Sequence, residues 1–182
     1  MKNNKPAVYI DSCCFIDMVA YDTSNKVLED RKEHIWYYKR LLSASKNEDI
    51  TVVTSYLTIN ECLHVKDDDD KKVLDENVKN LFNSILLSGQ QFGGVYSAVP
   101  DEFILEHARN LNWEHDIRLD PFDSLHIATA LWEQCDEFVT TDKNSIDKQG
   151  NIVKLEKMGL RVIEAVETKS LPEEYLQMNT HE

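Results

Sequence analysis

Short apolar runs alternate along this chain with longer segments of helical spacing. Runs rich in β-branched and aromatic residues predict five strands, at residues 7–10, 50–54, 95–99, 138–141 and 160–163. Apolar residues that recur every three or four positions predict helices at 12–19, 28–42, 55–63, 73–87, 100–111 and 121–132. Strands and helices that alternate in this way predict an α/β fold, with a mostly parallel sheet covered by helices on both faces.

The chain shows no internal repeat and no linker, so we expect its 182 residues to form a single domain, 1–182. The regular pattern spans about residues 7–165, and residues 168–182 are polar, which predicts a loose C-terminal tail. The acidic run Asp67–Asp70 interrupts the apolar pattern. Successive Asp side chains point in different directions, so we interpret this run as a solvated segment and keep a cation site as the alternative.

Composition limits the classes of function. The apolar fraction of 42% is ordinary for a soluble protein, no apolar run is long enough to cross a membrane, and the N-terminus lacks a signal cleavage site. The four cysteines lack the C-x-x-C spacing of zinc sites. We therefore expect a cytoplasmic protein with reduced thiols. The net charge of −13 implies that any contact with nucleic acid uses a local patch or metal ions.

The stretch from Pro121 to Asn144 combines a helix start, an apolar helix, a buried strand and two carboxylates. Asp123 falls in the first turn of the helix, because Pro121 favours the first helical position. Asp142 follows the strand at residues 138–141. Parallel α/β sheets bind their ligands outside the carboxyl ends of the strands, so both acids are candidate site residues.

Two further acids have a similar setting. Asp11 ends the first predicted strand, and Glu61 lies on the helix that follows the second strand. Carboxylates among apolar neighbours are costly to bury unless they are paired or bind a metal, and no Lys or Arg is adjacent to Asp11, Glu61 or Asp123. Ligands that are all oxygen suit Mg²⁺ or Mn²⁺, which can activate water and stabilise the charge of a phosphodiester under attack.

Three segments carry these acids, and together they resemble the PIN-domain ribonucleases, particularly toxins of the VapC type. The segments are YIDSCCFID, SYLTINECL and PFDSLHIATAL…CDEFVTTDKN, and the last is the most specific. The resemblance spans about residues 7–165. It implies a three-layer α/β/α sandwich with a five-stranded, mostly parallel sheet of order 3-2-1-4-5.

The resemblance also implies roles for individual residues. Asp11, Glu61, Asp123 and Asp142 would converge on divalent metal and form the catalytic site. Ser12 and Thr141 would orient water or a substrate phosphate around it. The chain departs from the family pattern in its Cys13–Cys14 pair, in its acidity and in extra length around residues 67–95.

Two other patterns give alternative interpretations. Glu61 and His64, like Asp123 and His126, are spaced as in di-iron proteins, but those proteins need a four-helix bundle, and strands are predicted here instead. We expect His126 to make a local hydrogen bond. Lys143 follows Asp142 directly and is either a phosphate-binding residue or a solvated one.

The sequence thus predicts a metal-dependent endoribonuclease that hydrolyses RNA phosphodiester bonds, with the toxin of a toxin–antitoxin pair as one role. A metal-dependent DNase shares the same acid chemistry, because these residues do not read the 2′-hydroxyl. A catalytically silent protein-binding module is the alternative from another class. The predicted partners are RNA and a cognate antitoxin or a second copy of the chain, and no membrane.

Overall fold

The computed structural model contains one five-stranded sheet, and it describes residues 5–24, 27–62, 76–86 and 94–177. The strands are β1 (Ala7–Ile10), β2 (Thr51–Ser55), β3 (Val95–Ala98), β4 (Glu137–Val139) and β5 (Arg161–Ile163). All four pairings are parallel, and the order is β3-β2-β1-β4-β5. This topology confirms the predicted sheet and its 3-2-1-4-5 order.

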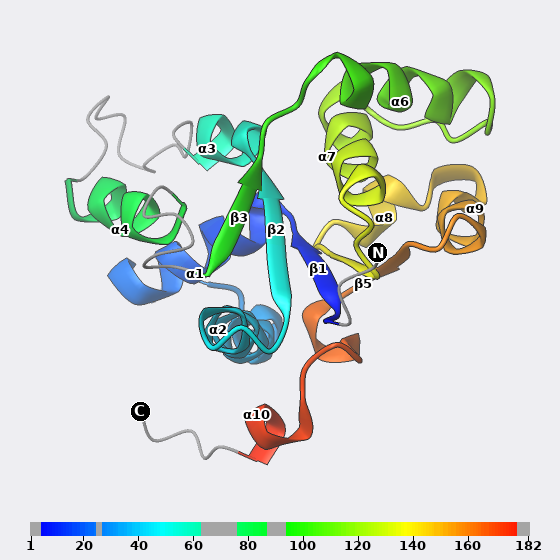
Figure 1. Cartoon of the computed structure of the whole chain (residues 1–182). Coiled ribbons are helices and arrows are strands. Elements are labelled where there is room, and N and C mark those ends of the chain that lie inside the picture. The colour runs from blue at the N-terminus through cyan, green and yellow to red at the C-terminus, as the bar shows by residue number, and fades with distance from the viewer. Residues whose placement is uncertain (1–4, 25–26, 63–75, 87–93, 178–182) are drawn as a thin grey trace.

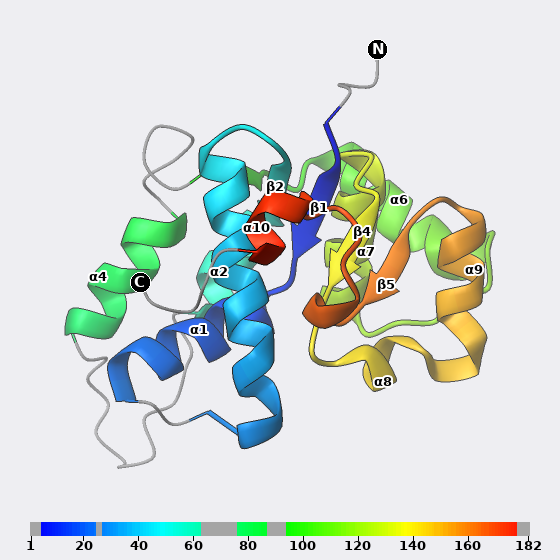
Figure 2. The ribbon, with the colours of Figure 1, turned by 90° about the horizontal axis from the view of Figure 1, so that it is seen from below.

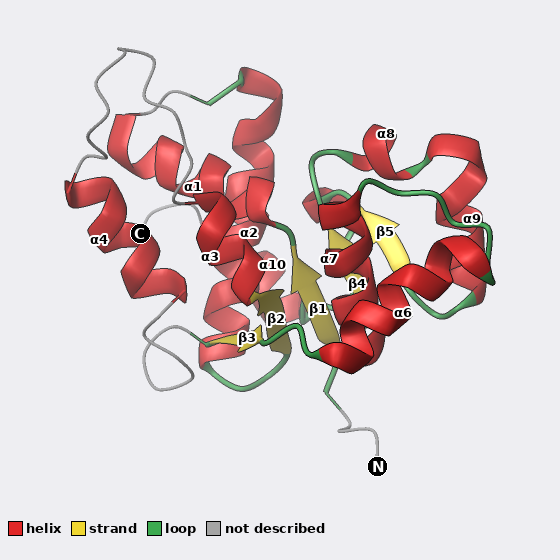
Figure 3. Cartoon of the chain, turned by 90° about the horizontal axis from the view of Figure 1, so that it is seen from above, coloured by secondary structure: helices red, strands yellow, loops and turns green. Residues whose placement is uncertain are grey.

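Helices cover both faces of the sheet, as Figures 1 and 3 show. The helices of the first group are α1 (Ser12–Ser24), α2 (Lys32–Lys46), α3 (Tyr56–Cys62), α4 (Glu76–Leu86) and α10 (Glu173–Gln177). The second group, on the opposite face, contains α6 (Glu102–Trp113), α7 (Pro121–Trp132), α8 (Lys143–Ile146) and α9 (Asn151–Lys157). Single 3-10 turns lie at Glu29–Arg31, Lys148–Gly150 and Ala165–Glu167. The molecule is therefore the predicted α/β/α sandwich.

Strand β1 shows why the sheet needs both helical layers. Successive side chains of a strand point to opposite faces. Val8 and Ile10 belong to the core under the first helical group, while Tyr9 belongs to the core under the second, and all three are at most 1% exposed. A strand that is buried on both faces reads as a continuous apolar run, which explains how the sequence reveals it.

The fourth strand begins and ends earlier than predicted. Glu137 is 1% exposed, and its carboxylate accepts hydrogen bonds from the Arg161 side chain at 2.6 Å, the Thr168 hydroxyl at 2.6 Å and the Lys169 amide at 2.9 Å. These partners let a charged residue open a buried strand. Because β4 ends at Val139, residues 140–142 form a loop beyond the carboxyl end of the strand.

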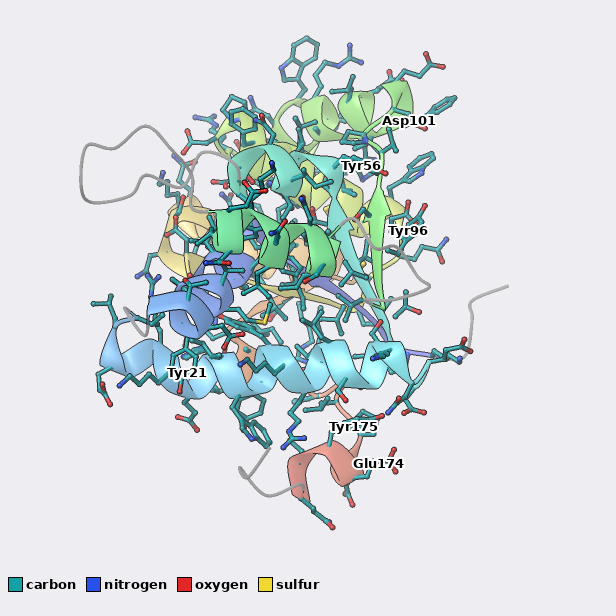
Figure 4. The ribbon with its side chains drawn as sticks, turned by 90° about the vertical axis from the view of Figure 1, so that its left-hand side faces the viewer. Tyr21, Tyr56, Tyr96, Asp101, Glu174 and Tyr175 are labelled. Atoms are coloured by element: carbon teal, nitrogen blue, oxygen red, sulfur yellow. The ribbon has the colours of Figure 1, made fainter. Side chains whose placement is uncertain are left out.

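The prediction of a loose tail from Thr168 is wrong for residues 168–177. Leu171 and Tyr175 are 6% and 3% exposed and join the core under the first helical group. The Tyr175 hydroxyl donates to Asp49 at 2.6 Å and accepts from Asn47 at 2.8 Å. Helix α10 consequently lies against α2, as Figure 2 shows, and Figure 4 shows Tyr175 between them. The packed chain thus continues at least to residue 175.

The sheet excludes the four-helix bundle that a di-iron site requires. His64 and the acidic run at residues 67–70 lie outside the described residues, so both interpretations of that run stay predictions. Within the described ranges, no helix combines the length and the apolar character needed to cross a membrane.

Two leucines of the C-terminal segment test whether it packs on the core. Leu171→Ala should lower the free energy of unfolding by about 2 kcal/mol or more, because it leaves a cavity in the core. Leu176 is 46% exposed, so Leu176→Ala should change that free energy by less than about 0.5 kcal/mol. Urea unfolding measures both variants, and equal midpoints would show that residues 168–177 do not pack as described.

Candidate active site

Asp11 lies directly after β1, and both of its carboxylate oxygens are held. Its Oδ1 accepts a hydrogen bond from the Ser12 amide at 2.7 Å, and its Oδ2 accepts one from the Thr140 hydroxyl at 2.8 Å. The thiol of Cys13 also lies 3.2 Å from Oδ2. The backbone amide of Asp11 donates to Val139 O at 3.0 Å, so the pairing of β1 with β4 continues to this residue. Asp11 is therefore fixed at the carboxyl edge of the sheet.

Glu61 comes from α3, which follows β2 directly. Its Oε2 lies 2.8 Å from Nε2 of His126, and Nδ1 of His126 lies 2.6 Å from the Tyr9 hydroxyl. Burial acts to raise the pKa of Glu61, but the hydrogen bond and charge of His126, together with Ser12, outweigh it and hold the pKa below its usual value. Glu61 is therefore ionised at neutral pH.

Asp123 stands in the first turn of α7, where Pro121 starts the helix as predicted. The Ser145 hydroxyl donates to its Oδ2 at 3.3 Å. Partial burial and then the negative charge of Asp11 raise the pKa of Asp123. The two carboxylates are thus close enough to repel each other.

Asp142 occupies the loop between β4 and α8 and is exposed. Its amide donates to the Thr140 hydroxyl at 3.0 Å, and its carbonyl accepts from the Ser145 amide at 3.1 Å. The Thr140 hydroxyl in turn donates a hydrogen bond to the Asp11 carboxylate, and the Ser145 hydroxyl donates one to the Asp123 carboxylate. One short loop therefore connects Asp142 to the residues that hold both other aspartates.

The donor chemistry of these residues fits a divalent ion. Every candidate ligand is a carboxylate oxygen, as Mg²⁺ and Mn²⁺ prefer. Among the described residues, no Lys or Arg forms an ion pair with Asp11, Asp123 or Asp142. The hydrogen bond from Ser145 and the nearby His126 ring oppose the rise in the pKa of Asp123 but do not cancel it. The described residues contain no group of three or more His, Cys, Asp or Glu side chains arranged to hold an ion. The site has the right chemistry but not a closed coordination shell.

The residues predicted to support the acids differ in their contacts. Ser12 contacts Asp11 through its amide at 2.7 Å and its hydroxyl at 3.4 Å. The threonine that reaches Asp11 is Thr140, whereas Thr141 contributes its amide to the Cys13 sulfur at 3.4 Å. Lys143 forms an ion pair with Glu167 at 2.7 Å. Successive side chains of an extended chain point in opposite directions. Thr140 and Thr141 are adjacent, so when one hydroxyl faces Asp11 the other does not.

His126 makes long-range contacts, so the expected local hydrogen bond is wrong. The ring is 2% exposed and contacts Tyr9 and Glu61, which are 117 and 65 residues away in the chain. Its position three residues after Asp123 was the available signal, because residues i and i+3 share a helix face. Its partners come from other elements, and the spacing does not reveal them.

A cavity of about 680 Å³ lies at the opposite edge of the sheet from the acids. The first residues of four strands line it, namely Ala7, Thr51, Glu137 and Arg161. The acids instead follow the carboxyl ends of β1 and β4, where parallel sheets bind ligands. The acid site is therefore distinct from this cavity.

Comparison with models of known protein families places the chain in a family. A protein-family model described as "PIN domain" matches residues 8–151, which is most of the chain. No curated protein matches the sequence.

Thr140 and Thr141 form a matched pair for a test of the hydrogen bond to Asp11. Thr140→Val removes a buried donor to a carboxylate, so it should lower the free energy of unfolding by about 1.5–3 kcal/mol. Thr141→Val should change it by less than about 0.5 kcal/mol, because the hydroxyl has no partner among the described residues. Chemical denaturation measures both, and equal losses would contradict the assignment.

The raised pKa of Asp123 predicts a gain in stability when its charge is removed. A carboxyl whose pKa is higher in the folded than in the unfolded state destabilises the fold increasingly as pH rises through these two values. Asp123→Asn should therefore raise the free energy of unfolding of the metal-free protein at pH 7. The gain should vanish at a pH below about 3.9, the usual pKa of Asp. Denaturation over a pH series measures it, and a loss of stability at pH 7 would contradict the raised pKa of Asp123.

Proposed function

Because this chain belongs to the PIN-domain family, we propose that it is a metal-dependent endoribonuclease that hydrolyses RNA phosphodiester bonds. PIN domains are generally nucleases and typically use divalent metal ions. The observation that carries the proposal is the pair Asp11 and Asp123, two carboxylates that repel each other beside the carboxyl edge of the sheet. A pair of this kind is stabilised by a cation.

In this proposal Asp11, Asp123 and Asp142 bind Mg²⁺ or Mn²⁺, and Glu61 completes the site. A bound divalent ion supplies positive charge that offsets a phosphodiester and lowers the pKa of water. The hydrogen bonds from Ser12 and Thr140 keep the Asp11 carboxylate in place. Asp142 is exposed and unpaired within the described residues, so it can turn toward an ion and substrate without losing a contact.

Lys143 already has an anionic partner, which bears on its proposed contact with a substrate phosphate. The Lys143 ammonium is bound to Glu167, and this contact holds the pKa of Glu167 below its usual value. A phosphate that contacts Lys143 therefore competes with Glu167 for the ammonium group. We therefore propose Lys143 as a substrate contact that forms only when nucleic acid is bound, and Thr141 as a neighbour of that substrate.

The biological setting is part of the proposal. We propose that the protein acts in the cytoplasm, which is consistent with its four cysteines all being free thiols. The resemblance to VapC toxins supports a role in a toxin–antitoxin pair, in which an antitoxin would cover the site. A homodimer is the other proposed assembly.

Asp11→Asn should abolish RNA cleavage while the fold is retained, because it removes ligand charge but almost no volume. We expect the wild type to cleave a mixed RNA pool with Mn²⁺ or Mg²⁺ and to lose this activity with chelator. Gel electrophoresis of the products measures cleavage, and circular dichroism checks the fold. Asp116→Asn is the matched control, since Asp116 is exposed and its carboxylate forms surface ion pairs with Arg118 and Lys154.

Two outcomes would contradict the proposal. Cleavage of single-stranded DNA but not RNA would indicate a metal-dependent DNase. No cleavage of either substrate by folded wild type with metal would indicate a protein-binding module.

A further inference from the structure

His126 is a buried imidazole between two partners from different parts of the fold. It lies on α7, is 2% exposed, and has a partner at each ring nitrogen. The partner at Nε2 is Glu61 on α3, and the partner at Nδ1 is Tyr9 on β1. Helices α3 and α7 belong to opposite helical layers (Figure 3). The contact between His126 and Glu61 therefore joins the two layers.

The chemistry of the partners fixes where the ring carries a proton. An ionised carboxylate only accepts hydrogen bonds, so Nε2 of His126 donates to Glu61. In the neutral ring Nδ1 then accepts, and the Tyr9 hydroxyl is the donor. With both nitrogens occupied and the ring buried, His126 has no free atom with which to reach a substrate.

Tyr9 is itself held rigidly. It pairs with Phe138 across the β1–β4 ladder, and the two rings stack with centroids 5.1 Å apart and an interplanar angle of 7°. The Tyr9 side chain is 0% exposed. The register of the central strands thus determines where the Tyr9 hydroxyl lies, and the hydroxyl determines the orientation of His126.

This arrangement sets the position of one candidate ligand relative to another. Asp123 precedes His126 by one helical turn, so both side chains lie on the same face of α7. The bond from His126 to Glu61 consequently fixes Glu61 with respect to Asp123. It also occupies Oε2 of Glu61, which leaves Oε1 free of this contact.

We propose that His126 is a positioning residue that holds Glu61, through Tyr9 and the sheet register, in the orientation in which Glu61 takes part in divalent ion binding. The inference rests on the proposed metal site. It adds a residue, His126, that orients one of the candidate ligands and whose contacts the sequence did not reveal. Removal of a group that hydrogen-bonds to a metal ligand typically weakens metal affinity by about 10–100-fold.

Two substitutions of His126 separate positioning from packing. His126→Met fills a similar volume but has no donor, so it should raise the dissociation constant for Mn²⁺ by about 10–100-fold. His126→Gln keeps an N–H donor that can reach Glu61, so it should restore most of the affinity. Electron paramagnetic resonance of free Mn²⁺ measures binding without any RNA. The matched control is His107→Met on α6, which should leave the affinity unchanged.

The hydrogen bond is also observable without metal. The Nε2 proton of His126 should give a slowly exchanging imidazole signal in the NMR spectrum of the metal-free wild type. Glu61→Gln should shift this signal, because it replaces the charged acceptor. Absence of the signal from a folded wild type would overturn the proposed hydrogen bond and with it the inference.

The outcomes also distinguish this inference from the proposed function. Wild type that binds Mn²⁺ in an Asp11-dependent way, with a weaker His126→Met variant rescued in His126→Gln, supports the inference. Equal affinity of wild type and a folded His126→Met variant would overturn the inference and leave the metal site intact. Binding that Asp11→Asn does not weaken would overturn the metal site itself.

Discussion

The parallel pairing of β1 with β2 on one side and β4 on the other is the constraint on which the site depends. Since all the strands run in the same direction, the segments that leave β1, β2 and β4 emerge at one edge. Asp11, the helix that carries Glu61, and the loop of Asp142 are therefore neighbours although they are far apart in the chain. A change of register by one residue would turn the strand side chains to the other face and separate these groups.

The sequence predicted the elements that this constraint organises, because each has a strong local signal. A strand buried on both faces is a short apolar run, and a carboxylate at its end is conspicuous. Pro121 marked the start of α7 and so placed Asp123 in its first turn. The candidate ligands were accessible to sequence reasoning because they interrupt apolar patterns.

The supporting contacts were not predicted, because they depend on how elements pack. Thr140 and Thr141 are adjacent residues of the same type. The position at which β4 ends determines which of the two hydroxyls faces Asp11. The bond between His126 and Glu61 joins residues 65 positions apart, so no periodicity reveals it. In the C-terminal segment, Leu171 and Tyr175 stand in a largely polar stretch without helical or strand spacing, which gives too weak a pattern to predict burial.

The electrostatics of the site oppose the stability of the protein alone. Partial burial and then the charge of Asp11 raise the pKa of Asp123, so keeping Asp123 ionised at neutral pH costs folding free energy. His126 lies within hydrogen-bond reach of Glu61. Burial acts to lower the pKa of His126, but the hydrogen bond to Glu61 and the negative charges of Asp11, Glu61 and Asp123 outweigh it and raise that pKa. A chain with a net charge of −13 adds no general attraction for a polyanion. Cations at the carboxyl edge would therefore have two physical effects, since they would relieve the repulsion between the aspartates and provide the local positive charge that a nucleic-acid phosphate requires.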